Sequence, residues 1–546
     1  MYKFLILCFL VYAGGMKAQV APTQTVSRPK LVVGIVVDQM RWDFLYRYYD
    51  RYAPNGGFKR MLHQGFSCEN TFIPYAPTVT APGHATVYTG SVPAIHGITG
   101  NAWWDRQQMR SVYCTEDRSV HAVGIDASSA GQMSPRNMLA SSICDQLQFA
   151  SNFKSKVIGV AIKDRGSILP AGHTADGAYW YDGRSGKFIT SDYYMKELPQ
   201  WVNAFNEKKW PDQLYKQNWN TLYPINSYVQ SSADEKIYEG KPLGADKKGF
   251  PYDLSGFIEK NYGTIASTPH GNTLTFEMAK AAIEAEQMGK DAITDFLAIS
   301  FSSPDYIGHS FGPNSIEIED TYLRLDKNLG DLLTYLDTKV GRGQYLVFLS
   351  ADHGVSPIPG FLAENKMPGG VFNEHTWMAS MNTTLKERFG NDNLIVSMYN
   401  YQVHLNHRII DSVKLDISAI KTYILKYLEQ QKGIAQAFDI ERIMQIPLNA
   451  KMRERFANGY FPRRNGDIQL IAEPNWIEGG TTGTTHGSWY PYDAHIPLLF
   501  YGWNIKAGKL NRETYMTDIA PTIAAMLKIE MPSGTVGDVI PEVFLK

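Results

Sequence analysis

Three aspartates each follow a short apolar run, and this arrangement can gather carboxylates at one place in a folded chain. Asp38, Asp305 and Asp352 come at or just beyond the ends of runs rich in Val, Ile, Leu and Phe. Such runs are typical of strands buried on both faces of a parallel sheet. The carboxyl ends of the strands form the ligand-binding edge of an open α/β sheet, so we expect the three carboxylates to converge.

Histidines accompany these aspartates at spacings that suit metal ions. His309 follows Asp305 by one helical turn, which puts imidazole and carboxylate on one helix face. His486 lies in a loop of Gly and Thr, where an imidazole has no evident packing role. We expect two metal-ligand sets, one of Asp305, His309 and His486, and the other of Asp38, Asp352 and His353. Mixed His and Asp ligation is compatible with zinc, and two adjacent ions can clamp the attacking and leaving oxygens of a displacement.

Each of these residues also has an ordinary structural interpretation. An Asp after a strand is more often a helix cap or a turn former, and a lone His is usually structural. The six residues become informative only as a set.

Thr80 is the candidate nucleophile. It lies in Pro77-Thr-Val-Thr80-Ala-Pro82-Gly, just before an expected helix whose first turn tolerates Pro82. Free N–H groups and the positive end of the helix dipole would favour a phosphate there, and zinc ligation would lower the hydroxyl pKa. The alternative is that Thr80 is an ordinary helix N-cap.

The chain alternates expected strands with expected helices, which predicts an α/β fold. The clearest strands are 31–37, 157–162, 296–301, 345–349 and 496–500, and an apolar stripe over 318–336 predicts a long helix. We expect a catalytic core in three parts, 30–166, 270–355 and 466–546, in which 468–472 resumes the core pattern. The stretch 167–269 lacks sustained periodicity and predicts an irregular cap, and 356–465 predicts a second insertion.

Composition excludes some classes of partner. Charged residues make up 20% of the chain and hydrophobic residues 44%, as in an ordered globular protein. The formal net charge is -1, so no general attraction to nucleic acid or to an anionic membrane is expected. No protein partner is evident from the sequence either. Any anion must be bound locally.

The N-terminus predicts a cleavable signal peptide over residues 1–18. Lys3 precedes an apolar run that ends near Ala13, and small residues lead to Ala18. The run is shorter than the roughly 20 residues that a membrane-spanning helix needs. Cys8 stands too early in the chain for a lipoprotein signal to work. We expect a periplasmic or secreted protein without a membrane span.

As a set, these motifs resemble those of the alkaline phosphatase superfamily. The motifs in that order are Asp38, the T-x-T-x-P segment at Thr80, the G-x-x-G-N turn ending at Asn101, D-x-x-x-H at Asp305, D-H-G at Asp352 and T-T-H at His486. The resemblance implies an alkaline-phosphatase-like, mostly parallel central sheet flanked by helices, with inserted cap segments. It also implies two zinc ions, attack by Thr80 on phosphorus, a phosphothreonine intermediate and release of inorganic phosphate.

Two features separate the branches of this superfamily. Thr80 with Asn101 resembles the arrangement in the nucleotide pyrophosphatase/phosphodiesterases. Sulfatases need C/S-x-P-x-R at this place, and Thr80-Ala-Pro82-Gly-His84 has neither the Cys or Ser nor the Arg. Lys163 and Arg165 follow the strand 157–162, where period-two alternation would put both on one side. Such a pair resembles the single-threonine alkaline phosphatases and favours phosphate monoester dianions. Asn101, Lys163 and Arg165 would then bind the nonbridging oxygens. The alternative is a phosphodiesterase or nucleotide pyrophosphatase on the same scaffold.

Overall fold

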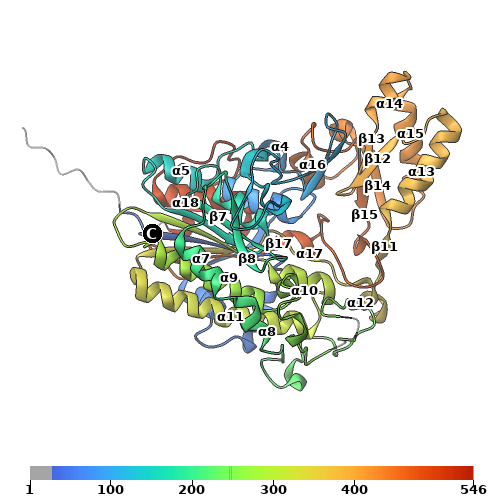
Figure 1. Cartoon of the computed structure of the whole chain (residues 1–546). Coiled ribbons are helices and arrows are strands. Elements are labelled where there is room, and N and C mark those ends of the chain that lie inside the picture. Colours follow the sequence, from blue (N-terminus) through green and yellow to red (C-terminus); the bar gives the residue numbers. More distant parts are fainter. Residues whose placement is uncertain (1–26, 245, 248, 545–546) are drawn as a thin grey trace, which may run out of the picture.

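The structure, a computed structural model, describes residues 27–244, 246–247 and 249–544. The predicted signal peptide, 1–18, lies outside the described residues. An 11-stranded sheet forms the centre of the molecule (Figure 1). Its strands, in order across the sheet, are β17 (His495–Ile496), β2 (Phe66–Phe72), β18 (Leu498–Gly502), β10 (Tyr345–Ser350), β1 (Leu31–Val37), β9 (Asp295–Phe301), β6 (Val157–Ala161), β7 (Gly177–Asp182), β8 (Lys187–Ser191) and β5 (Ala122–Val123), and β19 (Gly508–Tyr515) pairs with β2.

The middle of this sheet is parallel and its margins are antiparallel. Strands β10, β1, β9, β6 and β7 run in one direction. Strand β18 is antiparallel to β10, and β8 is antiparallel to β7. β1, β9 and β10 are buried along their whole length, because helices cover both faces. The predicted α/β class and parallel centre are confirmed.

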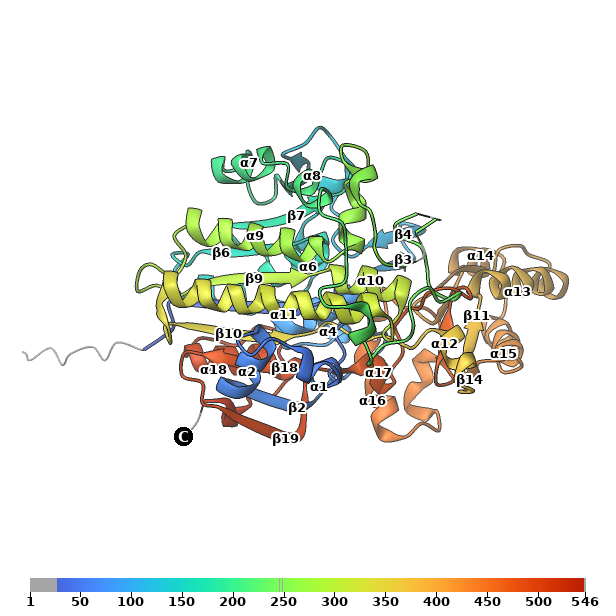
Figure 2. The ribbon, with the colours of Figure 1, turned by 90° about the horizontal axis from the view of Figure 1, so that it is seen from below.

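Helices pack on the two faces of the sheet as separate layers. One layer contains α3 (Thr80–Thr89), α5 (Ile143–Ala150), α6 (Asp164–Ala171) and α18 (Ile519–Leu527). The other contains α2 (Gly57–Gln64), α9 (His270–Ala285), α10 (Ser303–Phe311) and α11 (Ile316–Leu336), and Figure 2 shows α9 and α11 lying along the strands. The apolar stripe predicted over 318–336 is the buried face of α11, and Tyr322, Leu325 and Leu332 on it are fully buried.

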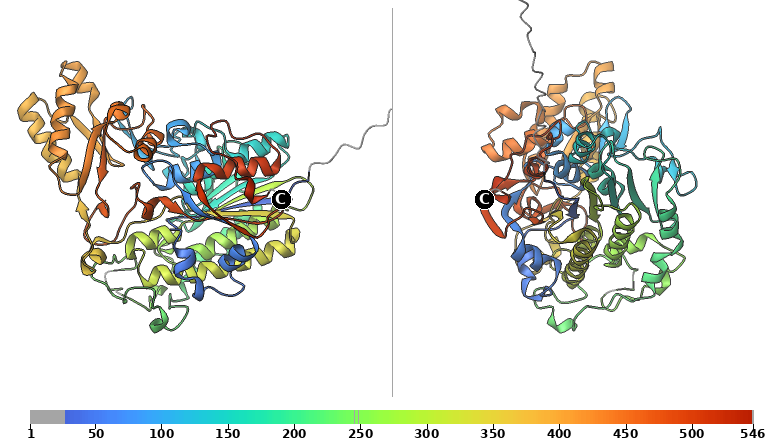
Figure 3. Two further views of the ribbon diagram at one scale, coloured as in Figure 1. Left: turned by 180° about the vertical axis from the view of Figure 1, so that it is seen from behind. Right: turned by 90° about the vertical axis from the view of Figure 1, so that its left-hand side faces the viewer.

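A second lobe, residues 370–478, projects from the main body (Figure 3). It contains a four-stranded sheet of β12 (Ile395–Tyr399), β13 (Gln402–Leu405), β15 (Ile468–Ala472) and β14 (Ile434–Asp439). Helices α13 (Glu374–Phe389) and α15 (Ile417–Leu428) complete a hydrophobic core of its own. The prediction that 468–472 returns to the central sheet is therefore wrong: β15 is a buried middle strand of this smaller sheet, and burial gives it the same apolar pattern.

The predicted irregular stretch 167–269 also differs in part. Strand β7 pairs in parallel with β6, and β8 continues the same sheet. Their sequences, Gly-Ala-Tyr-Trp-Tyr-Asp and Lys-Phe-Ile-Thr-Ser, are short and mixed, so they give little periodic signal. Residues 192–269 contain short helices and loops and lack a strand among the residues described. The outer limits of the inserted segments stay a prediction.

Candidate active site

Three neighbouring parallel strands bring the aspartates together. β1 lies between β9 and β10, with Val36 opposite both Ser300 and Ser350. Asp38 leaves the end of β1, and its main-chain N–H donates to the carbonyl of Phe301 at 3.1 Å. All three carboxylates are buried, with Asp38, Asp305 and Asp352 at most 4% exposed.

The structure groups the predicted ligands into two sets that share one histidine. Ligand atoms of Asp38, Asp352 and His353 lie within 4.8 Å of one another, and so do those of Asp305, His353 and His486. His309 joins the second set through Asp305, because its Nε2 lies 3.2 Å from Oδ1 of that residue. Helix α10 provides this geometry, as predicted from the spacing of four. The sets are adjacent, since the rings of His353 and His486 stack at 3.5 Å between centroids.

The three imidazoles are oriented as metal ligands commonly are. Nδ1 of His309 lies 2.8 Å from the carbonyl of Thr484, Nδ1 of His486 lies 2.8 Å from that of Thr78, and Nδ1 of His353 lies 2.9 Å from that of Gly354. A carbonyl only accepts, so each Nδ1 donates, and in the neutral ring Nε2 keeps a free lone pair for a metal ion. Metal-bound histidines typically make such a hydrogen bond through the other ring nitrogen.

The charge of the site also fits divalent cations. Three buried carboxylates surround one ammonium: Nζ of Lys163 lies 2.7 Å from Oδ2 of Asp38 and 2.5 Å from Oδ2 of Asp305. Within the described part of the chain, Oδ1 of Asp38 and Oδ2 of Asp352 accept no hydrogen bond, and neither of these two oxygens pairs with Lys163. Buried acceptors without donors are costly unless a cation approaches them. The residues present therefore fit metal ions.

Burial shifts the pKa values of most of these groups, and neighbouring charges modify the shifts. Burial, and then the nearby Asp352, raises the pKa of Asp38 well above its ordinary value. Burial raises the pKa of Asp352 to about 6 and lowers that of His353 to about 4. Burial would raise the pKa of Asp305 too, but His309 and Lys163 hold it well below its usual range. A bound cation would favour the deprotonated form of every ligand.

Thr80 is the first residue of α3 and faces the shared histidine. Its Oγ1 lies 3.4 Å from Nε2 of His353. The N-cap position is Val79, so the alternative interpretation of Thr80 as an N-cap is wrong. Gly83, in the first turn, lets α3 approach closely: a Cβ there would come within 2.4 Å of the carbonyl oxygen of Asp352.

Asn101 lies beside the start of the same helix. Its Oδ1 accepts a hydrogen bond from the main-chain N–H of Ala81 at 2.9 Å. With Oδ1 engaged, the Nδ2 hydrogens are left to donate. Thr80 and Asn101 are therefore held together by one main-chain contact.

Lys163 contacts the ligand carboxylates and Arg165 lines a hollow together with Lys163, but the reason given from sequence for placing the two cations is wrong. Strand β6 ends at Ala161 and α6 begins at Asp164, so the strand alternation used to place the two cations does not extend to them. Lys163 is the residue before the helix, and Arg165 is in its first turn. Both line a hollow of about 260 Å³ together with Tyr306 and Trp180.

Gln39 is a site residue that the sequence interpretation missed. Its main-chain N–H donates to Oδ1 of Asp352 at 3.0 Å, and its Nε2 donates to Oδ1 of Asp305 at 2.7 Å. The residue is 2% exposed and adopts a left-handed φ of 68°. That conformation is uncommon outside glycine and often marks a functional position. The signal available was its place directly after Asp38.

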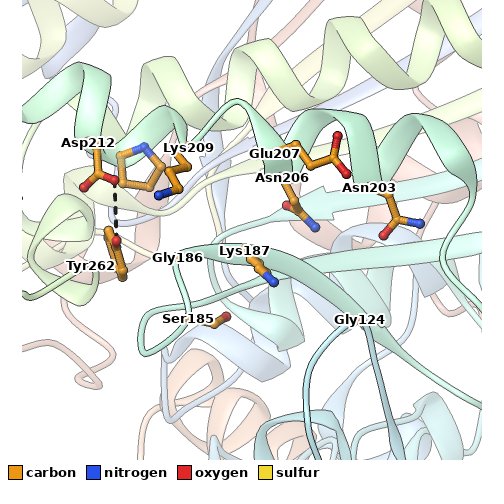
Figure 4. A pocket seen from close by; sticks show the side chains of 11 residues that line it. Gly124, Ser185, Gly186, Lys187, Asn203, Asn206, Glu207, Lys209, Asp212 and Tyr262 are labelled. Atoms are coloured by element: carbon orange, nitrogen blue, oxygen red, sulfur yellow. Dashed lines mark hydrogen bonds between the residues drawn. The ribbon is translucent and has the colours of Figure 1, made fainter. Parts of the chain in front are cut away.

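Another hollow, of about 510 Å³, lies away from these residues between β8 and the helices α7 (Gln200–Glu207) and α8 (Trp210–Tyr215) (Figure 4). Some of its polar groups already have partners. Asn206, for example, exchanges two hydrogen bonds with the main chain of Phe188. None of the Asp, His or Thr residues of the site lines it.

Comparison with known proteins agrees with this geometry. The sequence profile described as "Type I phosphodiesterase / nucleotide pyrophosphatase" matches residues 32–489. The chain is 51% identical over 543 residues to alkaline phosphatase PhoV of Synechococcus elongatus, covering 98% of this chain and 97% of that protein. It is 53% identical over 540 residues to a protein of Myroides odoratus named calcium-transporting ATPase, with coverage of 98% and 97%.

A solved structure extends the similarity to the fold. The chain is 52% identical over 541 residues to alkaline phosphatase PafA of Elizabethkingia meningoseptica, covering 98% of each protein. A crystal structure of wild-type PafA superposes with a TM-score of 0.93, covering 95% of this chain and 99% of that one. The protein belongs to the type I phosphodiesterase/nucleotide pyrophosphatase family of the alkaline phosphatase superfamily.

Proposed function

We propose that the protein is an alkaline phosphatase that hydrolyses small-molecule phosphate monoesters with two zinc ions and releases inorganic phosphate. The observation that carries this proposal is the position of Thr80, at the start of α3 and 3.4 Å from the histidine shared by two ligand sets. The relatives named alkaline phosphatases support the same reaction. Nucleic acid is not a proposed partner, because the formal charge is -1.

The proposed zinc ligands are the residues predicted from sequence. One set is Asp38, Asp352 and His353, and the other is Asp305, His309 and His486, with the Thr80 hydroxyl at the first. Zinc, when bound, supplies a Lewis acid that stabilises negative charge on the attacking and leaving oxygens. His353 lies within reach of both sets, so the division of ligands between the ions rests on the family resemblance.

The chain's own residues perform the rest of the proposed reaction. Thr80 Oγ1 attacks phosphorus as the bond from phosphorus to the leaving oxygen breaks, which gives a phosphothreonine and an alcohol. Water then attacks the phosphothreonine from the opposite side, and phosphate leaves with Thr80 restored. Asn101, through its free Nδ2 hydrogens, and the cations Lys163 and Arg165 bind the nonbridging oxygens, which carry most of the charge. The main-chain N–H groups that begin α3 add a favourable dipole.

The alternative is a phosphodiesterase or nucleotide pyrophosphatase on the same scaffold. Lys163 and Arg165 favour the monoester, because a monoester dianion presents more charged oxygen than a diester monoanion does. In the described residues Lys163 pairs with two ligand carboxylates, so metal loading would free its charge for the substrate.

The test is the ratio of kcat/KM for p-nitrophenyl phosphate to that for methyl p-nitrophenyl phosphate, measured on zinc-loaded mature protein. A ratio strongly in favour of the monoester, with activity lost in Thr80→Ala, supports the proposal. A ratio in favour of the diester would move the protein to the phosphodiesterases. Acid quenching during turnover, followed by mass spectrometry, should find phosphate on the Thr80 peptide, and its absence would contradict the phosphothreonine.

We also propose that the protein is exported to the periplasm or secreted after cleavage of residues 1–18. The support is the sequence pattern of this segment. None of the helices described in 27–244, 246–247 and 249–544 is both long and apolar enough to cross a membrane. N-terminal sequencing of the exported protein should begin near Gln19. An intact Met1 on the exported protein would contradict cleavage.

A further inference from the structure

A β-hairpin follows Asn101 directly and ends beside Arg165. Its strands are β3 (Ala102–Asp105) and β4 (Arg110–Tyr113), and Tyr113 lies opposite Ala102. The N–H of Cys114 donates to the carbonyl of Asn101 at 3.0 Å and closes the base of the hairpin. Tyr113 therefore lies beside Asn101 in space.

The hydroxyl of Tyr113 connects this hairpin to the start of α6. It accepts a hydrogen bond from Nη1 of Arg165 at 2.9 Å and donates to Oδ1 of Asp164 at 2.8 Å. Thr115, two residues further along the hairpin, donates to Oδ2 of Asp164. Tyr113 and Thr115 thus occupy both carboxylate oxygens, and the carboxylate in turn fixes the direction of the Tyr113 hydroxyl.

Arg165 has few other constraints. Across the described ranges its guanidinium forms no ion pair. Its hydrogen bond there is the one that Nη1 donates to the hydroxyl of Tyr113. Its Nε is buried without a partner. An arginine side chain loses considerable rotamer freedom when it is fixed, whereas a tyrosine has only two side-chain torsions and here is part of a hairpin. The tyrosine therefore supplies the rigidity that the arginine lacks.

The acceptor is also neutral, which matters for a group proposed to bind an anion. A carboxylate in direct contact with the guanidinium would compensate its charge before the substrate arrived. The phenol oxygen positions the guanidinium without this compensation, and Asp164 acts one hydrogen bond further away. The guanidinium itself stays charged, because arginine is not deprotonated in proteins.

We propose that Tyr113 is a positioning residue that sets the preference for phosphate monoesters over diesters, by holding Arg165 at the substrate oxygens. This inference rests on the proposed phosphatase function. The same hairpin begins at Asn101, so one local element holds two of the groups that bind the nonbridging oxygens. Of these two groups, Arg165 is the one expected to discriminate the dianion, since Asn101 is a neutral donor that serves both ester classes.

The experiment is the substitution Tyr113→Phe, which removes one oxygen atom and keeps the ring. On zinc-saturated protein, kcat/KM for p-nitrophenyl phosphate should fall by about 10-fold, and that for methyl p-nitrophenyl phosphate should change by less than about 2-fold. Inhibition by inorganic phosphate should weaken by a similar factor of about 10, which reports the same contact at equilibrium. The double variant Tyr113→Phe/Arg165→Ala should be no worse than Arg165→Ala alone.

Tyr193→Phe is the matched control. Its hydroxyl donates to the carbonyl of His173 at 2.9 Å, away from the site, so both rates should stay unchanged. An unchanged monoester-to-diester ratio in Tyr113→Phe, or an equal fall in both rates, would overturn the inference. A wild-type protein that fails to prefer monoesters would instead overturn the proposed function. Zinc content and circular dichroism of Tyr113→Phe should match the wild type, so an equal fall in both rates cannot be attributed to loss of metal or fold.

Discussion

Replacing Gln39 with glutamate changes one hydrogen-bonding group beside a proposed zinc ligand and keeps the shape of the side chain. Nε2 of Gln39 donates to Oδ1 of Asp305 at 2.7 Å. In Gln39→Glu an oxygen takes the place of that nitrogen, so two carboxylates face each other. The main-chain N–H of residue 39 still donates to Oδ1 of Asp352 at 3.0 Å. The substitution therefore disturbs one ligand and leaves the other held.

The size of the effect follows from the lost contact. A hydrogen bond to a charged group contributes about 1.5–3 kcal/mol, and the contact that orients Asp305 is lost in Gln39→Glu. Taking about 2 kcal/mol, zinc affinity should weaken by roughly 30-fold. This value lies inside the range of about 10- to 100-fold typical of residues that orient metal ligands.

The measurement is a zinc titration of the metal-free protein in competition with a chromophoric chelator. Gln146→Glu is the matched control, because Gln146 is also buried and its Nε2 donates to the neutral Oγ of Ser141 at 2.9 Å, outside the site. We expect weaker zinc binding in Gln39→Glu alone. Equal zinc affinity in Gln39→Glu and wild type, with circular dichroism unchanged, would refute the reasoning that Gln39 orients Asp305.

Three further outcomes are expected. Gly83→Ala should lower the melting temperature and the activity, because its Cβ would lie 2.4 Å from the carbonyl oxygen of Asp352 and cost about 1–3 kcal/mol. Gly256→Ala should change neither, because nothing lies within 4 Å of its Cβ, and equal melting temperatures of the two variants in calorimetry would contradict this expectation. Burial lowers the pKa of His96 to about 3, so the contribution of neutral His96 to stability is complete above pH 6.5 and is lost as the pH falls toward 3. His96→Gln should therefore flatten the fall in melting temperature between pH 6.5 and pH 3, and parallel curves of melting temperature against pH for the variant and the wild type would exclude this. Chelation should abolish activity and added zinc should restore it in the wild type, while Thr80→Ala should bind zinc without activity; recovery by calcium alone would exclude zinc.

The carboxylate part of the site could be predicted from sequence because parallel strands share their direction. Strands β1, β9 and β10 are long apolar runs, and each is followed by an aspartate, so adjacency in the sheet brings Asp38, Asp305 and Asp352 together. His309 followed from helical spacing within α10. The type of fold and these ligand positions therefore depended on regular periodicity alone.

Other features depended on information that periodicity lacks. Tertiary packing, and not the apolar pattern, sets the partners of β15 and β7. From the sequence, β15 was therefore assigned to the central sheet, which is wrong, and β7 was assigned to no sheet. Arg165 was placed by strand alternation although α6 had already begun. Gln39 and Tyr113 belong to no ligand motif, and only hydrogen bonds seen in three dimensions identify them.

The order of the ligands along the chain bears on when the site can form during synthesis. The contact that orients His486 joins it to Thr78, 408 positions earlier, and the second lobe lies between them. A nascent chain that has presented Asp38 and Thr80 still lacks the proposed zinc ligand His486 until its last segment emerges. Contacts of such long range form late in folding. The enzyme would therefore acquire its full set of proposed ligands only as a completed chain, and the metal available in the compartment where folding ends would decide whether it becomes active.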